Sequence, residues 1–236
     1  CAMPMLCCSP DISNPDADAR QRARDHEAEM IRVTRRLGGP RAACRILSGQ
    51  RYPEVPRAQG IEWVVESINT LLPVAREYDV VLAMENHYKD GYWLWPEFAQ
   101  KMDVFLEIVG AIDDRTHFGV QYDPSNAIVA GDDPIALLER VKDRVVTMHA
   151  SDRYLEPGAT LDDLRQTDGT IGYFAKLKHG VTGKGLNDYD RIFAILKSVD
   201  YQGWISIEDG MNGMGEMKES IDFLKMMRAR YFMEKP

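Results

Sequence analysis

Short apolar segments and longer amphipathic segments alternate along the chain. Six short segments are apolar at nearly every position: 4–9, 43–49, 80–86, 117–123, 144–150 and 204–209. None shows the strict polar–apolar alternation that is typical of a strand with one solvated face. Strands that are apolar on both faces are typical of parallel sheets covered by helices. The pattern therefore predicts buried strands in a parallel sheet.

Each of these strands is followed by a segment with the start signals of a helix. Asn14 predicts the first cap, Pro73 predicts a kink or a new start within the second helix, and Pro96 predicts the start of the third. Regular alternation of strand and helix indicates βαβ units. We therefore predict a single α/β domain that covers residues 1–236.

One segment, 153–186, interrupts this alternation. It is rich in glycine and polar residues, and it is longer than the loops that usually join a strand to a helix. Long loops in compact domains are usually functional. We predict that this insertion is a lid over a binding site and that it contains a short helix near 160–166.

Composition and charge restrict the class of protein. The 236 residues are 44% hydrophobic, which is enough for a large core. The apolar runs are far shorter than the roughly 20 residues of a membrane helix. The net charge of −8 argues against a nucleic-acid partner. The cysteines (Cys1, Cys7, Cys8 and Cys44) lack zinc-ribbon spacing, and no signal peptide pattern is seen, so we expect reduced thiols in the cytoplasm.

Four strand candidates end in a good metal ligand. These ligands are Glu85, Asp123, His149 and Glu208. Because the carboxyl ends of parallel strands meet at one edge, residues that are distant in sequence become neighbours there. Three carboxylates and an imidazole would repel or compete unless a cation lay between them. The sequence therefore predicts a divalent-metal site to which no cysteine contributes.

Each of these residues also has an ordinary structural interpretation. A carboxylate after a strand is usually a helix cap or a solvated loop residue, and Asp123 precedes a proline and could simply start a turn. A lone His149 would more often be a hydrogen-bonded core residue. Their joint occurrence at four strand ends favours a metal site, and the oxygen-rich set favours Mn²⁺, Mg²⁺ or Co²⁺ over structural zinc.

Further polar and aromatic side chains lie at or just after the same strand ends. We identify these candidates for substrate binding: Arg51, His87, Trp93, Asn126, Asp152 and Arg153. Asp152 could support the His149 ligand, and Arg153 could bind a hydroxyl, carboxylate or phosphate group. Trp93 could form one wall of a sugar pocket. Solvation or packing at the surface is the alternative for each of them.

Several motifs together resemble a known family, the xylose isomerase-like TIM-barrel superfamily of sugar phosphate isomerases and epimerases. The motifs are LAMENHY, FGVQYDPSNA, VVTMHASDR, GKGLNDYDRIF and GWISIEDG, which begin at residues 82, 118, 145, 183 and 203. The superfamily includes ketose 3-epimerases, inosose dehydratases and endonuclease IV-type enzymes. The resemblance covers the chain from about residue 40 to residue 225 and implies a (β/α)8 barrel.

The resemblance also implies roles for individual residues. Glu85, Asp123, His149 and Glu208 would bind one divalent cation, with Mn²⁺ expected first and Mg²⁺, Co²⁺ or Zn²⁺ as alternatives. The two glutamates would be the acid/base pair on opposite sides of a sugar or polyol substrate. One would remove a proton next to a carbonyl group, and the other would return a proton to the resulting enediolate. Arg153 resembles the substrate-contacting arginine that follows the histidine ligand. Ketose epimerases often carry a histidine where this chain has Asn126, which leaves the reaction type open.

The number of strands differs from that of the family. The family barrel has eight strands, whereas the sequence predicts six here, or seven if the region near 181–185 contributes. We expect the first two βα units, on the order of 50–60 residues, to be missing from this chain. The metal site would still lie wholly inside it, and a partner chain, as in a homo-oligomer, could cover the exposed sheet edges.

The leading hypothesis is a metal-dependent sugar or sugar phosphate isomerase or epimerase. The first alternative is a dehydratase of the same superfamily, which shares the proton abstraction but then expels a hydroxyl group. An endonuclease IV-like phosphodiesterase is a lesser alternative, because it needs additional metal ligands and a DNA-binding face. The remaining alternative is a sugar-binding subunit without catalytic activity.

Overall fold

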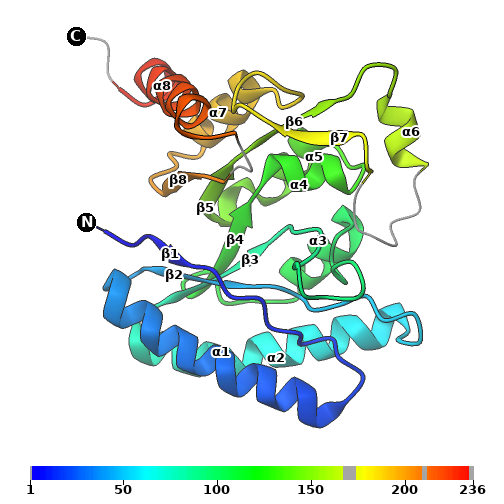
Figure 1. The fold of residues 1–236 in the computed structure, drawn as a ribbon. Coiled ribbons are helices and arrows are strands. Elements are labelled where there is room, and N and C mark those ends of the chain that lie inside the picture. The colour runs from blue at the N-terminus through cyan, green and yellow to red at the C-terminus, as the bar shows by residue number, and fades with distance from the viewer. Residues whose placement is uncertain (1, 167–173, 209–211, 234–236) are drawn as a thin grey trace.

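The parallel strands form one curved sheet in a computed structural model that describes residues 2–166, 174–208 and 212–233. The strands follow the order β1-β2-β3-β4-β5-β8, and every neighbouring pair is parallel (Figure 1). Their bounds are Met5–Leu6 (β1), Ala43–Ile46 (β2), Val81–Glu85 (β3), Phe118–Tyr122 (β4), Val145–Ala150 (β5) and Trp204–Ile207 (β8). All six predicted strands are confirmed.

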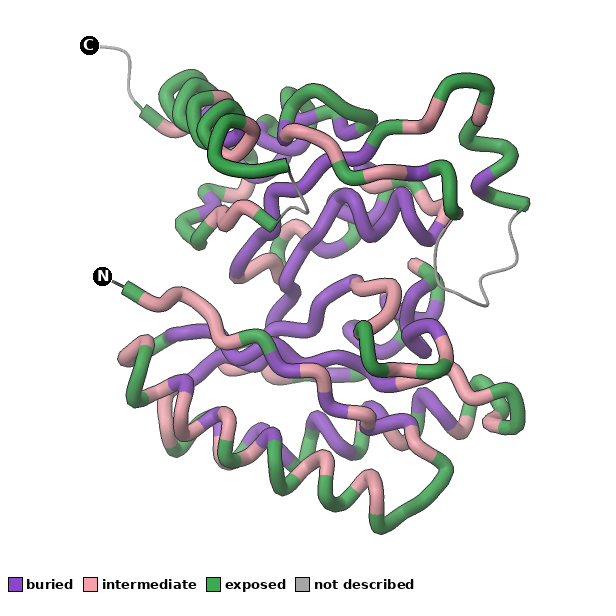
Figure 2. Tube along the Cα trace, viewed as in Figure 1, coloured by how far each residue is buried: buried purple, intermediate pink, exposed green. Residues whose placement is uncertain are grey.

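Helices follow the strands and cover the outer side of the sheet. Their bounds are Ala17–Gly38 (α1), Arg57–Tyr78 (α2), Met102–Gly110 (α3), Pro124–Val129 (α4), Pro134–Val141 (α5), Tyr189–Ser198 (α7) and Met214–Tyr231 (α8), with a 3-10 turn at Lys142–Arg144. The main hydrophobic cluster combines strand residues with the inner faces of these helices, and Figure 2 shows the burial concentrated there. This layered arrangement is a partial α/β barrel, as the sequence predicted.

Two predicted helix starts were wrong, and of the two alternatives for Pro73 the new start is not seen, whereas a kink stays a prediction. The first helix is capped by Asp16, whose carboxylate accepts from the amide of Asp18, and not by Asn14. The second helix continues through Pro73, because that residue lies on the exposed face, where water can satisfy the carbonyl that loses its partner. Pro96 does not begin a helix, because the next residue, Glu97, is held in a bridge to the segment after β2.

The segment 153–186 contains an antiparallel ribbon beside the sheet. The ribbon pairs β6 (Asp152–Leu155) with β7 (Leu177–Gly180), and the helix α6 (Leu161–Arg165) confirms the short helix predicted near 160–166. The region near 181–185 adds no strand to the parallel sheet. Part of the predicted lid, 167–173, lies outside the described residues, and a lid function stays a prediction.

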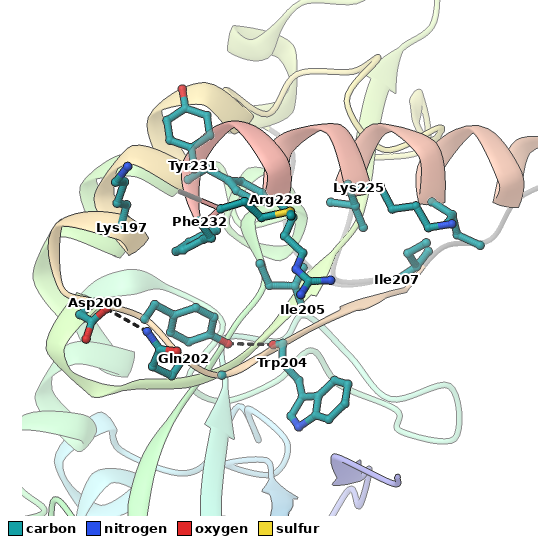
Figure 3. A pocket seen from close by; sticks show the side chains of 16 residues that line it. Lys197, Asp200, Gln202, Trp204, Ile205, Ile207, Lys225, Arg228, Tyr231 and Phe232 are labelled. Atoms are coloured by element: carbon teal, nitrogen blue, oxygen red, sulfur yellow. Dashed lines mark hydrogen bonds between the residues drawn. The ribbon is translucent and has the colours of Figure 1, made fainter. Parts of the chain in front are cut away.

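The last strand leaves an open edge beside a groove. β8 pairs with β5 and β1 pairs with β2, and within the described ranges no strand joins β1 to β8. A groove between β8 and α8 is lined by Ile205, Ile207 and Arg228, among others (Figure 3). Trp204 is 57% exposed at this edge. The barrel is therefore open on this side.

We predict that Gly119→Ala will destabilise the sheet at the contact between β4 and β5. A Cβ atom there would lie 2.5 Å from Cγ1 of Val146 and 2.8 Å from the carbonyl oxygen of Arg144. Overpacking of this kind costs about 1–3 kcal/mol of unfolding free energy, measurable by urea denaturation. Gly110→Ala is the control, because nothing lies within 4 Å of a Cβ atom at that position. Equal stability of the two variants would contradict the prediction.

Candidate metal centre

The structure brings the four predicted metal ligands together at the carboxyl ends of four strands. Glu85 is the last residue of β3, Asp123 follows β4, His149 lies in β5 and Glu208 follows β8. One ligand atom from each side chain lies within 4.8 Å of the others. The arrangement follows directly from the parallel register, which places these strand ends at the same edge of the sheet.

Asp123 caps a helix with one carboxylate oxygen and can offer the other to a cation. Its Oδ1 atom caps α4 by accepting from the amides of Ser125 (2.7 Å) and Asn126 (3.1 Å), and it also accepts from the hydroxyl of Ser151 (2.9 Å). These bonds all end on Oδ1, so Oδ2 is the oxygen available to a cation. The helix-cap interpretation and the metal-ligand interpretation of this residue are therefore compatible.

His149 links the two glutamates. Its Nδ1 atom lies 3.2 Å from Oε1 of Glu85 and 3.0 Å from Oε2 of Glu208. Glu85, Asp123 and His149 are buried, whereas the side chain of Glu208 is 45% exposed. The centre is therefore closed on three sides and accessible from the side of Glu208.

Buried charge perturbs each of these groups. Burial and the charges of Glu208 and Glu85 raise the pKa of Asp123 to about 7. Burial would also raise the pKa of Glu85, but the hydrogen bond with His149 and the charge of Arg45 contribute to lowering it to about 2. Burial would lower the pKa of His149, but hydrogen bonds with Cys7 and Glu208 contribute to raising it to about 12. The donor set therefore carries an excess of negative charge that fits an oxygen-preferring divalent cation.

Two residues of the centre were missed by the sequence analysis. Arg45, in β2, forms an ion pair with Glu85 through Nη1 and Oε2 at 2.8 Å, and its side chain is only 9% exposed. Cys7, just after β1, is a side-chain hydrogen-bond partner of His149. Cys7 is not one of the four grouped ligands, so the prediction of a metal site without a cysteine ligand stands. The signal was available for Cys7, because it directly follows β1, as Asp123 follows β4.

Three of the candidate substrate contacts lie at or beside the centre. Asn126 donates from Nδ2 to Oε1 of Glu85 (3.2 Å). His87 lies 3.3 Å from Glu97 through Nδ1 and Oε2, and its ring stacks on Tyr88 with centroids 5.0 Å apart. The guanidinium of Arg153 lies 5.9 Å from the centroid of the same tyrosine ring, and that side chain is buried. Asn126 therefore contacts Glu85 directly, whereas His87 and Arg153 both lie against Tyr88.

Asp152 anchors a turn through both of its carboxylate oxygens. Its Oδ1 accepts from the amides of Arg153 (2.9 Å) and Asn187 (3.1 Å), and its Oδ2 accepts from the amides of Gly183 and Gly185 (both 2.9 Å). Main-chain donors occupy both oxygens, so the carboxylate anchors the turn at 183–187. The structure thus shows a loop anchor, and a contact of Asp152 with a substrate or support of the His149 ligand stays a prediction.

The remaining two candidates lie on loops near the rim. Trp93 is partly buried, and its amide donates to the carbonyl of Asp90 (3.1 Å) in a turn. The amide of Arg51 donates to the carbonyl of Pro96 (2.8 Å). A contact of either side chain with a substrate stays a prediction.

The chain as a whole matches a family model, described as Xylose isomerase-like TIM barrel, over residues 2–227. The protein therefore belongs to this family, and the suspected superfamily is confirmed. Within the described residues, no helix is both long and apolar enough to cross a membrane.

Similar proteins include enzymes and solved barrels. An inosose dehydratase of Bacillus thuringiensis (strain Al Hakam) is 24% identical over 152 residues, which are 62% of this chain and 47% of that protein. The IOLI protein with a bound zinc atom superposes with a TM-score of 0.73 at 16% identity, over 98% of this chain and 77% of the other. A D-tagatose 3-epimerase-like protein gives a TM-score of 0.73 at 17% identity, over 96% and 78%. The chain spans about half the length of the curated relatives it matches.

We predict that Asp123→Asn will stabilise the metal-free protein at neutral pH. The folded pKa of about 7 lies above the unfolded value of about 3.9, so the folded state binds the proton more tightly. The contribution of Asp123 to the stability of the metal-free protein is therefore lost as pH rises from about 4 to 7. Asparagine does not ionise, so the variant does not lose this contribution. We expect its free energy of unfolding at pH 8 to exceed that of the wild type by on the order of 2 kcal/mol, measured by urea denaturation in the presence of a chelator.

The matched control for this experiment is Asp133→Asn. Asp133 also caps a helix ahead of a proline, through bonds from the amides of Ile135 and Ala136, but it lies outside the centre. Its substitution removes the same kind of helix cap away from the cluster of ligands, so we expect no gain in stability at pH 8. A wild-type slope in the Asp123 variant, or the same gain in the control, would contradict the prediction.

Proposed function

We propose that the protein is a divalent-metal-dependent isomerase or epimerase of sugars or sugar phosphates. The observation that carries the proposal is the pair of glutamates, Glu85 and Glu208, that share one imidazole at the edge of a barrel. A divalent cation held by the four ligands would polarise the carbonyl and hydroxyl oxygens of a sugar. The described cysteines (Cys7, Cys8 and Cys44) are free thiols, which supports a cytoplasmic location.

The two glutamates are suited to accept and return a proton. The pKa of Glu85 is lowered to about 2. Burial raises the pKa of Glu208, but the hydrogen bond with His149 and the charges of His149 and His87 together lower it below its ordinary value. Both are therefore ionised at neutral pH, which is the state that a proton acceptor requires. Glu208, which is more exposed, would face the entering substrate, and Glu85 would act from the buried side.

The neighbouring side chains would orient the substrate and hold Glu85. Asn126 and Arg45 each donate a hydrogen bond to a different oxygen of Glu85, which fixes the plane of the carboxylate. Arg153 and His87 would contact hydroxyl or phosphate oxygens of the substrate. Mn²⁺ is our first choice of metal, since oxygen ligands predominate.

A dehydratase that acts on a keto-sugar or keto-inositol is the second candidate. Two observations favour it: inosose dehydratases are among the similar proteins, and Asn126 replaces the histidine of the ketose epimerases. The same proton abstraction would then be followed by loss of a hydroxyl group from the adjacent carbon. Products distinguish the two, because only the dehydratase yields a lighter, unsaturated or diketo compound.

We predict that Glu85→Gln and Glu208→Gln will each reduce solvent deuterium incorporation by at least about 10²-fold. Incorporation into keto-sugars, their phosphates and inososes is followed by NMR in D₂O with added Mn²⁺. Glu107→Gln serves as the control, because that glutamate forms an exposed ion pair with Arg57. Addition of a chelator should abolish exchange in the wild-type protein. Exchange at the wild-type rate in either variant would show that the acid/base assignment is wrong.

A further inference from the structure

A second cluster of metal-ligating side chains lies between the sheet and the first helix. It consists of Cys8, just after β1, Cys44 in β2 and Glu27 in α1, and one ligand atom from each lies within 4.8 Å of the others. It is separate from the first centre. Neighbouring residues of a strand point to opposite faces, so Arg45 reaches Glu85 inside the barrel while Cys44 faces the helix.

Glu27 is the residue that points to a ligand. Its side chain is completely buried, and Oε1 accepts from Sγ of Cys44 at 3.4 Å. Its other oxygen, Oε2, has no hydrogen-bond partner. Burial raises the pKa of this carboxyl group. A buried carboxyl oxygen without a partner is costly, and a cation would compensate it.

We propose that Cys8, Cys44 and Glu27 form a second, thiolate-containing site for Zn²⁺ or a similar thiophilic divalent cation. Tetrahedral zinc with Zn–S of about 2.3 Å and Zn–O of about 2.0 Å places sulfur and oxygen about 3.5 Å apart. The observed separation between Sγ of Cys44 and Oε1 of Glu27 is 3.4 Å. Cys44 and Glu27 therefore already have the spacing of two zinc ligands, and the ligand atom of Cys8 lies within 4.8 Å of both.

A disulfide bond between the two cysteines fits the structure less well. Leu6 is the residue opposite Cys44 in the sheet register, so Cys8 lies two residues further along. An extended course gives Cα atoms about 8 Å apart, and a disulfide requires less than about 7 Å. The diagonal position across two strands suits a bridging ion instead.

Charge balance at the second site is consistent with a divalent cation. Binding would displace the protons of the side chains, and the two thiolates and one carboxylate would then carry three negative charges, of which the ion neutralises two. The Nε atom of Arg45 donates to the carbonyl oxygen of Cys8 (3.1 Å), so a further positive charge lies beside the cluster. A bound ion would tie α1 to β1 and β2, and its binding would stabilise the fold.

Cobalt titration distinguishes this site from the first centre. Co²⁺ bound by thiolates absorbs in the near ultraviolet through sulfur-to-metal charge transfer, which oxygen and nitrogen ligands do not produce. We expect the band in the full wild-type chain under reducing conditions, and its loss in Cys8→Ser and Cys44→Ser. Cys7→Ser is the matched control, because that thiol lies beside His149. Absence of the band in the wild type, or its loss in the Cys7 variant alone, would overturn the proposal.

A second variant keeps the test valid if the serine variants fail to fold. Glu27→Gln preserves the shape of the side chain and both cysteines, so the band should persist while Co²⁺ binds at least tenfold more weakly. Affinity is measured by competition with a chromophoric chelator. Unchanged affinity in this variant would exclude Glu27 as a ligand and would contradict the site as proposed.

Discussion

The buried ion pair between Arg45 and Glu85 is the interaction on which the metal centre depends. Three carboxylates converge at the strand ends, and Glu85 is the most deeply buried of them. Without Arg45, at 2.8 Å, its charge would be opposed only by histidines. Removing one partner of such a buried pair is strongly destabilising because it leaves a buried charge unpaired, whereas replacing both partners with apolar residues is often neutral. The ion pair therefore offsets the cost of burying the ionised carboxylate of Glu85 inside the barrel.

The alternation of side chains along β2 and along β1 with the residues just after it places polar and metal-ligating side chains on both faces of the sheet. Arg45 and Cys7 point towards the first centre, whereas Cys44 and Cys8 point towards α1. Because the period of a strand is two residues, a slip of one residue in register would exchange these sets. The hydrophobic pattern that fixes the register thus also fixes which groups meet a ligand.

The sequence predicted those parts of the site that lie at strand ends, and it failed where position depends on packing. Glu85 and His149 were found because an apolar run precedes each of them. Arg45 was missed because a charged residue within a predicted buried strand gives no indication of its partner across the sheet. The turn that Asp152 anchors was not predicted, because it is distant in sequence and only the tertiary structure brings those amides to the carboxylate.

The four ligands differ in how firmly the fold holds them. Glu85 and His149 lie on strands with a neighbour on each side, whereas Glu208 follows β8, which pairs with β5 at an edge of the sheet. Edge strands open more readily than central ones, so the position of Glu208 is the least constrained. This residue is also the most exposed ligand. Mobility and access therefore coincide at the one ligand that a substrate would meet first, and whatever stabilises β8 also sets the geometry of the centre.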